Sequence, residues 1–544
     1  MPLRARGSGR RTTWAVLAAM VAAVAIAAPV AAGSPPGFIT SKPSMVTPLA
    51  PGSTVTPIIS VGDTLPSGYM FESIPDGISL WKLRENRLAL FVNHETSTVP
   101  FPYSRTVQPP PSPEAYQNDF TNSQVSKLRL RTDNAHVLGG SYAIPSSANY
   151  QRFCSNFLAR RPHGFDRPLF FTNEEATDFV SRTGTAWTFG TPQTEPPSEQ
   201  AGVVVAMDPT TGDYKTIYGM GRLNHENSVA LKGFGQPTLL TTDDTFSTNP
   251  ASSQLYMYRA LNADAVWNDE GHLWAFKSSD PAIDSYYDFT PGSTMSVPGK
   301  FVRITDGAAR GPQAGLEAES DTKDVFQFVR LEDVAYDRDD PTIIYLADSG
   351  RASTDTSNGF ASTNGRIWRM ALHPEDPTRV LSLSILIDGD TALLKDPTAI
   401  HNPDNLETTR NSLLITEDPS SGNQFSQSDP SPAATTARLW MYDIATGVKT
   451  VVAKVDQSQD EGPDDVDAAP AGNKGAWETS GIIDASKWFG PGAFLIDVQA
   501  HSMWIDKAPG PDETGPTPGT PDGQPDYVYK REGGQLLLLR IPGA

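Results

Sequence analysis

The sequence has only one cysteine, Cys154, among its 544 residues. A single cysteine excludes an intramolecular disulfide, so the chain must be held together by buried apolar side chains and by any cations that it binds. A lone thiol is either an inert buried side chain or a metal ligand, and composition leaves both interpretations open.

Positive charge is also scarce. The chain has 43 Lys and Arg residues against 63 Asp and Glu residues, which gives a formal net charge of −20. Nucleic-acid binding depends on basic side chains that neutralise phosphates, so we expect no nucleic-acid partner. The acidic excess suits solubility outside the cell and supplies many oxygen ligands for cations.

Short catalytic motifs are absent as well. The sequence contains no Gly-x-Ser-x-Gly elbow, no Walker loop, no His-Glu-x-x-His and no Cys-x-x-Cys. These absences exclude the commonest local signatures of serine hydrolases, nucleotide-binding enzymes, zinc proteases and thiol oxidoreductases. A site in this protein would therefore be assembled from residues far apart in the chain.

The N-terminal residues predict export. Four arginines precede an apolar run over residues 14–28, and small residues follow up to Ala32, which is typical of a secretory signal peptide over residues 1–32. The Arg10-Arg11 pair fits an imperfect twin-arginine signal as well as a Sec signal, and an uncleaved anchor is the alternative. We expect a secreted protein, extracellular or periplasmic, with no stable membrane insertion after cleavage.

Short apolar runs and turn residues indicate an all-β fold. Runs such as GVVVAMD, TIIYLAD and QLLLLRI alternate with turn signals, and the chain has 44 Gly and 47 Pro. No strict repeat of 40–50 residues is visible. We predict a β-propeller with long loop insertions over residues 60–544, preceded by an N-terminal extension over residues 33–59. A two-sheet sandwich is the competing architecture.

One phrase recurs at intervals of roughly 50–110 residues: an apolar strand that ends in acidic or imidazole side chains. It occurs as LALFVNHE ending at Glu95, PLFFTNEE ending at Glu175, GRLNHEN around Glu226, QPTLLTTDD ending at Asp244, FVRLED at Glu332 and Asp333, IIYLADSG at Asp348, SLLITED at Glu417 and Asp418, and FLIDVQAH ending at His501. Strand ends that meet at a propeller axis would form one metal site. Because neighbouring side chains in a strand face opposite ways, we expect one residue of each pair at that site.

The order of these motifs resembles the PhoX family of alkaline phosphatases. Asn-His-Glu, a lone cysteine, Glu-Glu, GRLNHEN, TTDD, RLEDV, NPDNL, ETSGI and DVQAH follow one another from about residue 60 to the C-terminus. The resemblance implies a six-bladed propeller that hydrolyses phosphate monoesters by metal-activated oxygen attack, with Fe³⁺ and Ca²⁺ as cofactors. It also implies a small-molecule phosphomonoester as the partner, and we expect a monomer.

The resemblance extends to individual residues. It implies metal ligands at Glu95, Cys154, Glu174, Glu175, Glu226, Asp244, Glu332, Asp333, Asp404 and Glu478. Arg330 would bind the substrate phosphate, for which a bidentate guanidinium is suited. His225 could be a metal ligand, a proton donor or a hydrogen-bonded core residue. The chain departs from the family at Phe153-Cys154-Ser155-Asn156-Phe157, which lacks the Gly-Gly of the best-known members, so it resembles a divergent branch. The departure concerns the iron chemistry more than the fold.

Two other classes of function remain open on the sequence. A non-catalytic, calcium-stabilised extracellular scaffold would keep the structural acids without iron. Another metal-dependent hydrolase on the same fold, such as a lactonase or a phosphodiesterase, would need neither Cys154 nor Arg330.

Overall fold

The computed structural model describes most of the chain after residue 36. The described residues are 37–84, 86–95, 123–177, 179–180, 182, 199–245, 250–394, 396–418, 436–457, 477–506 and 527–544, with side chains omitted at 179, 501–506 and 527–532. They form the compact unit Gly37–Ala544. The predicted signal peptide, residues 1–32, lies outside them. Among the described residues, no helix has the length and apolar character needed to cross a membrane.

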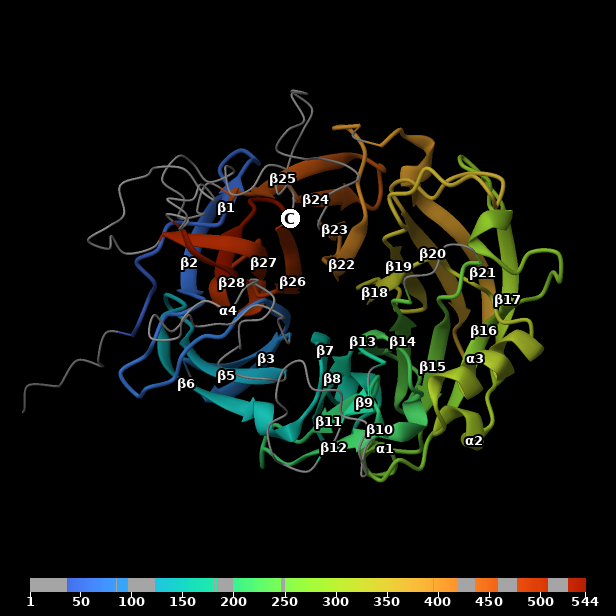
Figure 1. Ribbon diagram of the computed structural model, residues 1–544, viewed down its shortest axis with the longest axis horizontal. Helices are drawn as coiled ribbons and strands as arrows, with labels where there is room; N and C mark the ends of the chain where they lie inside the picture. Colours follow the sequence, from blue (N-terminus) through green and yellow to red (C-terminus); the bar gives the residue numbers. More distant parts are fainter. Residues whose placement is uncertain are drawn as a thin grey trace, which may run out of the picture. The chain divides into compact units, whose positions relative to one another are not determined.

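This unit consists almost wholly of antiparallel strands in six blades of four strands each (Figure 1). In chain order the blades are β3 (Pro75–Arg84), β4 (Arg87–His94), β5 (Gln124–Arg131) and β6 (Val137–Ile144); β7 (Phe153–Ala159), β8 (Leu169–Glu174), β11 (Val204–Met207) and β12 (Tyr214–Ile217); β13 (His225–Ala230), β14 (Thr238–Asp243), β15 (Leu255–Arg259) and β16 (His272–Ser278); β18 (Leu331–Tyr336), β19 (Ile343–Asp348), β20 (Arg366–His373) and β21 (Asp376–Asp388); β22 (Pro403–Thr408), β23 (Ser412–Glu417), β24 (Arg438–Asp443) and β25 (Lys449–Val455); and β26 (Glu478–Asp484), β27 (Ala493–Asp506), β28 (Tyr527–Arg540) and β2 (Thr54–Ser60).

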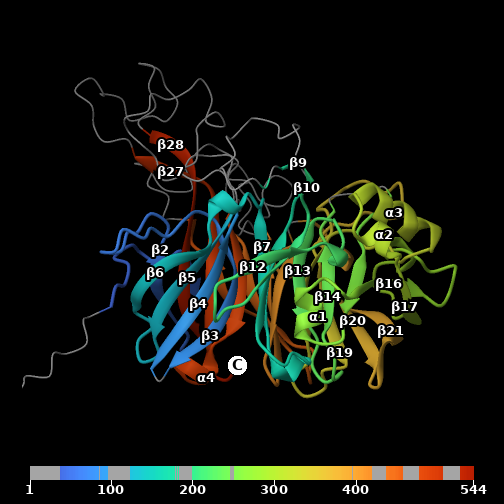
Figure 2. The same cartoon turned by 90° about the horizontal axis from the view of Figure 1, so that it is seen from below.

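The six innermost strands form a closed ring. Strands β3, β7, β13, β18, β22 and β26 contact one another in that order, and β26 contacts β3. Figure 1 looks down this ring, and Figure 2 shows the strands of the blades from the side. The all-β propeller prediction is confirmed, and the arrangement excludes a two-sheet sandwich.

The N-terminal extension completes the outer edges of the last two blades. Strand β2 pairs with β28 as the outermost strand of the last blade, and β1 (Val46–Pro48) pairs with β25 as a fifth strand of the blade before it. The boundary predicted at residue 60 therefore falls within β2. The extension is part of the propeller because it supplies hydrogen-bond partners to two strand edges.

The largest insertion lies between the third and fourth blades. Strand β17 (Ser296–Arg303) pairs with both β16 and β21 and joins the two blades into one nine-stranded sheet. Helices α2 (Asp306–Ala309) and α3 (Gln313–Thr322) follow it in the insertion, whereas α1 (Ala263–Trp267) lies between β15 and β16 of the third blade. The remaining short elements are the pair β9 (Phe179–Val180) and β10 (Glu199–Gln200), and helix α4 (Ser486–Phe489).

Burial explains why the inner strands show no alternation of buried and exposed residues. Every residue of β8, β13, β14 and β23 is buried, because each lies within a sheet that packs on both faces against neighbouring blades. Apolar clusters fill the spaces between adjacent sheets. A polar side chain on such a strand is therefore buried and must have a partner or bind a ligand.

Candidate metal centre

The inner strand pair of each blade carries the same irregularity. In the first blade Pro75 pairs with His94 and Ile78 with Val92, so the inner strand advances three residues while its neighbour advances two. The same shift occurs in the other five blades. It is a β-bulge, which bends a strand and re-aims its side chains. The alternation expected within each acidic pair is interrupted at these positions.

The first residue of each bulge faces the axis. These residues are Asp76, Cys154, Glu226, Glu332, Asp404 and Ser480, and all six line one cavity of about 160 Å³. They recur at intervals from 72 residues, between Cys154 and Glu226, to 106 residues, between Glu226 and Glu332. The propeller therefore does have an internal repeat, but the loop insertions make its spacing irregular.

The neighbouring strands complete the cavity, because the end of an antiparallel partner lies beside the start of the inner strand. Glu95, Glu175, Asp244 and Asp418 lie just beyond those strand ends. Gln499 lies within β27, where it pairs with Glu478, and both line the cavity together with Arg330. The lining thus holds nine carboxylates, one thiol and one guanidinium. We call it the acid cavity.

Three groups of potential ligand atoms lie side by side in the acid cavity. Asp76, Glu95 and Cys154 form the first, Cys154, Glu175 and Glu226 the second, and Glu226, Glu332 and Asp404 the third, with the ligand atoms of each group within 4.8 Å of one another. Adjacent groups share Cys154 or Glu226. Two groups contain sulfur and suit a transition metal such as iron, whereas the third contains only oxygen and suits calcium.

The electrostatics of the acid cavity require compensating positive charge. Burial and the neighbouring carboxylates raise the pKa of Asp76 to about 7. Burial likewise raises the pKa of Glu226 and Glu332, with Arg330 partly opposing the rise at Glu332. Burial and four nearby carboxylates also raise the pKa of the Cys154 thiol. Without cations these groups would be held protonated, whereas bound cations would restore the carboxylate and thiolate forms that serve as ligands.

Gln499 supplies an independent sign that the acid cavity takes a ligand. Its amide nitrogen donates to Glu95 Oε1 at 3.0 Å and to Ser480 Oγ at 3.1 Å. Its carbonyl oxygen is buried and accepts no hydrogen bond from the described residues. Gln499 is only 2% exposed. A buried amide oxygen in a carboxylate-lined cavity is a suitable cation ligand.

Arg330 is the one cation among the described residues that line the acid cavity. Its Nε and Nη2 donate to the two oxygens of Asp244 at 2.9 and 2.8 Å, and its Nη1 donates to Asp418 Oδ2 at 2.8 Å. Nη2 also lies 2.8 Å from Glu332 Oε1. Burial alone would lower the pKa of Arg330, but the surrounding carboxylates outweigh that effect and raise it. The guanidinium is therefore permanently charged and fixed in place.

The second residues of four bulges form hydrogen bonds between blades, either with the next blade or across the ring. Asn227 Nδ2 donates to Asp333 Oδ1 at 2.6 Å, and Asn405 Nδ2 donates to Ser155 Oγ at 2.9 Å. The first and last blades have glycine here, and a Cβ on Gly481 would lie 2.7 Å from the carbonyl oxygen of Asp76. This polar layer satisfies buried groups and holds the bulges in register.

The structure brings most of the predicted ligands together. Glu95, Cys154, Glu175, Glu226, Asp244, Glu332, Asp404 and Glu478 line the acid cavity, as does Arg330. Glu174 does not, because its carboxylate accepts from the amides of Gln151, Gly202 and Val203 and pairs with Arg182. Asp333 belongs to the polar layer, where Asp333 Oδ2 also accepts from the amide of Leu406 at 2.8 Å.

The histidines lie away from the acid cavity. His225 Nδ1 is 2.8 Å from Thr241 Oγ1 and Nε2 is 3.2 Å from the carbonyl oxygen of Gly221, so both ring nitrogens have partners. Burial lowers the pKa of His225 to about 4. His94 is similarly buried, whereas the side chain of His501 lies outside the described residues. The geometry gives His225 a structural role in the strand pair β13–β14.

Four lining residues were not among the predicted ligands. Asp76, Ser480 and Gln499 were missed, and Asp418 was noted in its motif without being assigned a role. Asp76 could have been found, since Pro75-Asp76-Gly77 matches Pro403-Asp404-Asn405, and both begin an innermost strand.

Comparisons with known proteins give weak likenesses. No protein-family model and no curated protein matches the sequence. Among solved structures, the NanB sialidase of Streptococcus pneumoniae is 8% identical with a TM-score of 0.34 over 78% of this chain and 65% of its own. The Trypanosoma rangeli sialidase is 10% identical with a TM-score of 0.33 over 90% and 59%. An endo-arabinase from Bacteroides thetaiotaomicron is 8% identical with a TM-score of 0.29 over 74% and 97%. The chain spans less than two thirds of either sialidase, and these scores carry no conclusion about activity.

Proposed function

We propose that this protein is an exported, metal-dependent phosphomonoesterase whose cations bind in the acid cavity. The observation that carries the proposal is the convergence of nine carboxylates, one thiol and one guanidinium on a buried space of about 160 Å³. Such a concentration of acid is costly unless cations neutralise it. The guanidinium among these acids favours a substrate that is itself an anion.

The donor atoms suggest which cations would bind. Glu226, Glu332 and Asp404 offer only oxygen and fit Ca²⁺, while Cys154 would add a thiolate to two adjacent positions and fits iron. Cations bound there would neutralise the phosphoryl oxygens and activate the attacking oxygen.

The role of the chain itself is to bind and orient the phosphate. Three carboxylates hold the guanidinium at the wall of the acid cavity, and a phosphate would replace at least one of them as the partner of Arg330. A planar, permanently charged group is suited to two phosphoryl oxygens at once. No histidine of the described residues lines the cavity, so His225 is not needed as a proton donor in this proposal.

The test is hydrolysis of 4-nitrophenyl phosphate together with metal analysis of the protein purified without chelators. We expect turnover by the wild type and a fall in kcat/KM of roughly 100-fold or more in Arg330→Met, because one preorganised donor contributes about that much. Metal content should be unchanged, since Arg330 is not a ligand. Arg303→Met, a surface arginine 41% exposed, is the matched control.

Other results would point elsewhere. Calcium without iron and without turnover would contradict the enzyme and favour a calcium-stabilised scaffold. Hydrolysis of a lactone or a phosphodiester that survives both Arg330→Met and Cys154→Ala would contradict the phosphomonoesterase in favour of a different hydrolase.

A further inference from the structure

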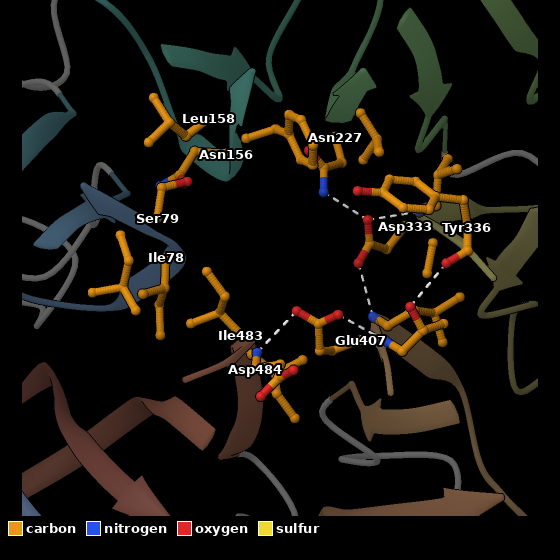
Figure 3. A pocket seen from close by; sticks show the side chains of 18 of the residues that line it. Ile78, Ser79, Asn156, Leu158, Asn227, Asp333, Tyr336, Glu407, Ile483 and Asp484 are labelled. Atoms are coloured by element: carbon orange, nitrogen blue, oxygen red, sulfur yellow. Dashed lines mark hydrogen bonds between the residues drawn. The ribbon is translucent and has the colours of Figure 1, made fainter. Parts of the chain in front are cut away.

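A second, larger cavity lies further along the same six innermost strands (Figure 3). Its volume is about 390 Å³, within the range of small-molecule sites. Each strand contributes residues beyond its bulge, such as Ile78 of β3, Leu158 of β7 and Ile483 of β26. Helix α4 adds Trp488 to the lining. We call this space the distal cavity.

Four basic side chains line the distal cavity. Lys487 lies on α4, and the other three follow the ends of innermost strands. Arg160 comes directly after β7, Lys232 two residues after β13, and Arg338 two residues after β18. Burial and the proximity of these three cations lower the pKa of His163 to about 4. Three positive charges therefore converge on one imidazole at the wall of the distal cavity.

Two of the three cations lack a carboxylate partner. Arg160 donates from Nη2 to the carbonyl oxygen of Leu80 at 3.1 Å, while its buried Nε has no acceptor among the described residues. Lys232 likewise pairs with no carboxylate within the described ranges. Arg338 differs, because its Nη2 contacts Glu407 Oε1 at 2.5 Å.

The acids of the distal cavity are already engaged. Asp333 accepts from Asn227, and Glu407 accepts from the amide of Asp484 at 2.9 Å (Figure 3). Asp333 also accepts from the amide of Leu406, and Glu407 from Arg338. Asp484 Oδ1 accepts from the amide of Ser486 at 2.9 Å. These bonds use the carboxylates within the chain and leave the charges of Arg160 and Lys232 uncompensated. In a chain of net charge −20, two such cations facing a cavity call for an anionic partner.

We propose that the distal cavity binds a small organic anion, with a carboxylate or phosphate group at Arg160 and Lys232. Its apolar part would lie against Ile78, Tyr336 and Trp488, which line the same space. The support for this ligand is the pair of positive charges at Arg160 and Lys232, which no carboxylate of the described residues neutralises. This site is separate from the acid cavity and does not depend on the proposed hydrolysis.

The test uses isothermal titration calorimetry of the full, metal-loaded protein with phenylphosphonate and, separately, with benzoate. Arg160→Met combined with Lys232→Met should weaken binding at one site by roughly tenfold or more, since charge-assisted hydrogen bonds are lost. Arg160→Lys should retain most of the affinity. Lys300→Met combined with Lys449→Met removes the same charge at exposed positions and is the matched control.

The outcomes separate the two cavities. A phenylphosphonate site that persists in Arg330→Met but disappears in the Arg160 and Lys232 variant would support the proposal, and the preferred ligand of the pair would distinguish phosphates from carboxylates. Unchanged binding in the Arg160 and Lys232 variant would overturn the proposal. Absence of any binding of both compounds to the wild type would overturn it as well, whatever the hydrolysis assay shows.

Discussion

The acid cavity and the distal cavity are built from the same six strands and carry opposite charge. The first bulge residue of each innermost strand faces the acid cavity, and four of those six residues are carboxylates. Past the ends of three of the same strands stand Arg160, Lys232 and Arg338. The polar layer of second bulge residues lies between. The sign of the charge that lines the propeller axis therefore depends on the position along the innermost strands and not on the overall composition of the chain.

Removal of bound cations should cause the largest loss of stability, and that loss should come from the acid cavity. Exhaustive dialysis against a chelator should lower the free energy of unfolding by about 4 kcal/mol for each ion bound at a thousand times its Kd. The physical reason is that the buried carboxylates of the acid cavity then repel one another without compensating charge. Denaturant unfolding with and without added Ca²⁺ measures the difference. Equal stability in both conditions would show that the acid cavity needs no cation.

Substitution of Gly77 should disturb the layer between the cavities. In Gly77→Ala the new Cβ would lie 2.6 Å from the backbone carbon of Ser155 and closer still to the amide nitrogen of Asn156. Overpacking against backbone should cost about 3 kcal/mol in denaturant unfolding. Gly315→Ala is the control, because that glycine lies in α3 with no atom within 4 Å of the added Cβ. If Gly77→Ala leaves the free energy of unfolding unchanged, the bulge can shift to accommodate the added Cβ, and the prediction is wrong.

Low pH should reduce the free energy of unfolding through His163, which lines the distal cavity. Because burial and three cations lower the pKa of His163 to about 4, the folded protein keeps this ring neutral while the unfolded chain protonates it near pH 6.5. The contribution is fully present above pH 6.5 and is lost as the pH falls towards 4, by roughly 3 kcal/mol. His163→Gln should remove that part of the pH dependence of unfolding. His373→Gln, in the β20–β21 hairpin, should leave it unchanged, and identical profiles for both variants would contradict the assignment.

The sequence was sufficient to predict the propeller and most of the acid cavity. Acidic strand ends such as Asn93-His94-Glu95 predicted side chains at the propeller axis. The prediction of their position is correct because these strand ends lie beside the innermost strands. The choice within a pair was harder. Glu174 and Glu175 are chemically identical, and only the backbone amides that surround Glu174 assign it to a structural role.

Other features depend on pairing register, which local sequence does not state. The bulges place adjacent residues such as Glu332 and Asp333 on different partners without simple alternation, and they are visible only when both strands are aligned. Asp76 was missed for a different reason: its acid begins a strand instead of ending one, and its match with Asp404 in Pro403-Asp404-Asn405 was not used. The distal cavity went unpredicted because Arg160, Lys232 and Arg338 lie in three unrelated loops until the ring brings them together.

The central claim is that the acid cavity holds metal ions, and elemental analysis tests it most directly. Inductively coupled plasma mass spectrometry of chelator-free protein should find at least two ions per chain, iron and calcium among them. Glu226→Gln should lose one or more, because Glu226 belongs to two of the three ligand groups, while the exposed control Glu270→Gln should lose none. A wild-type protein that carries neither iron nor calcium, at the same stability as its chelated form, would contradict the account.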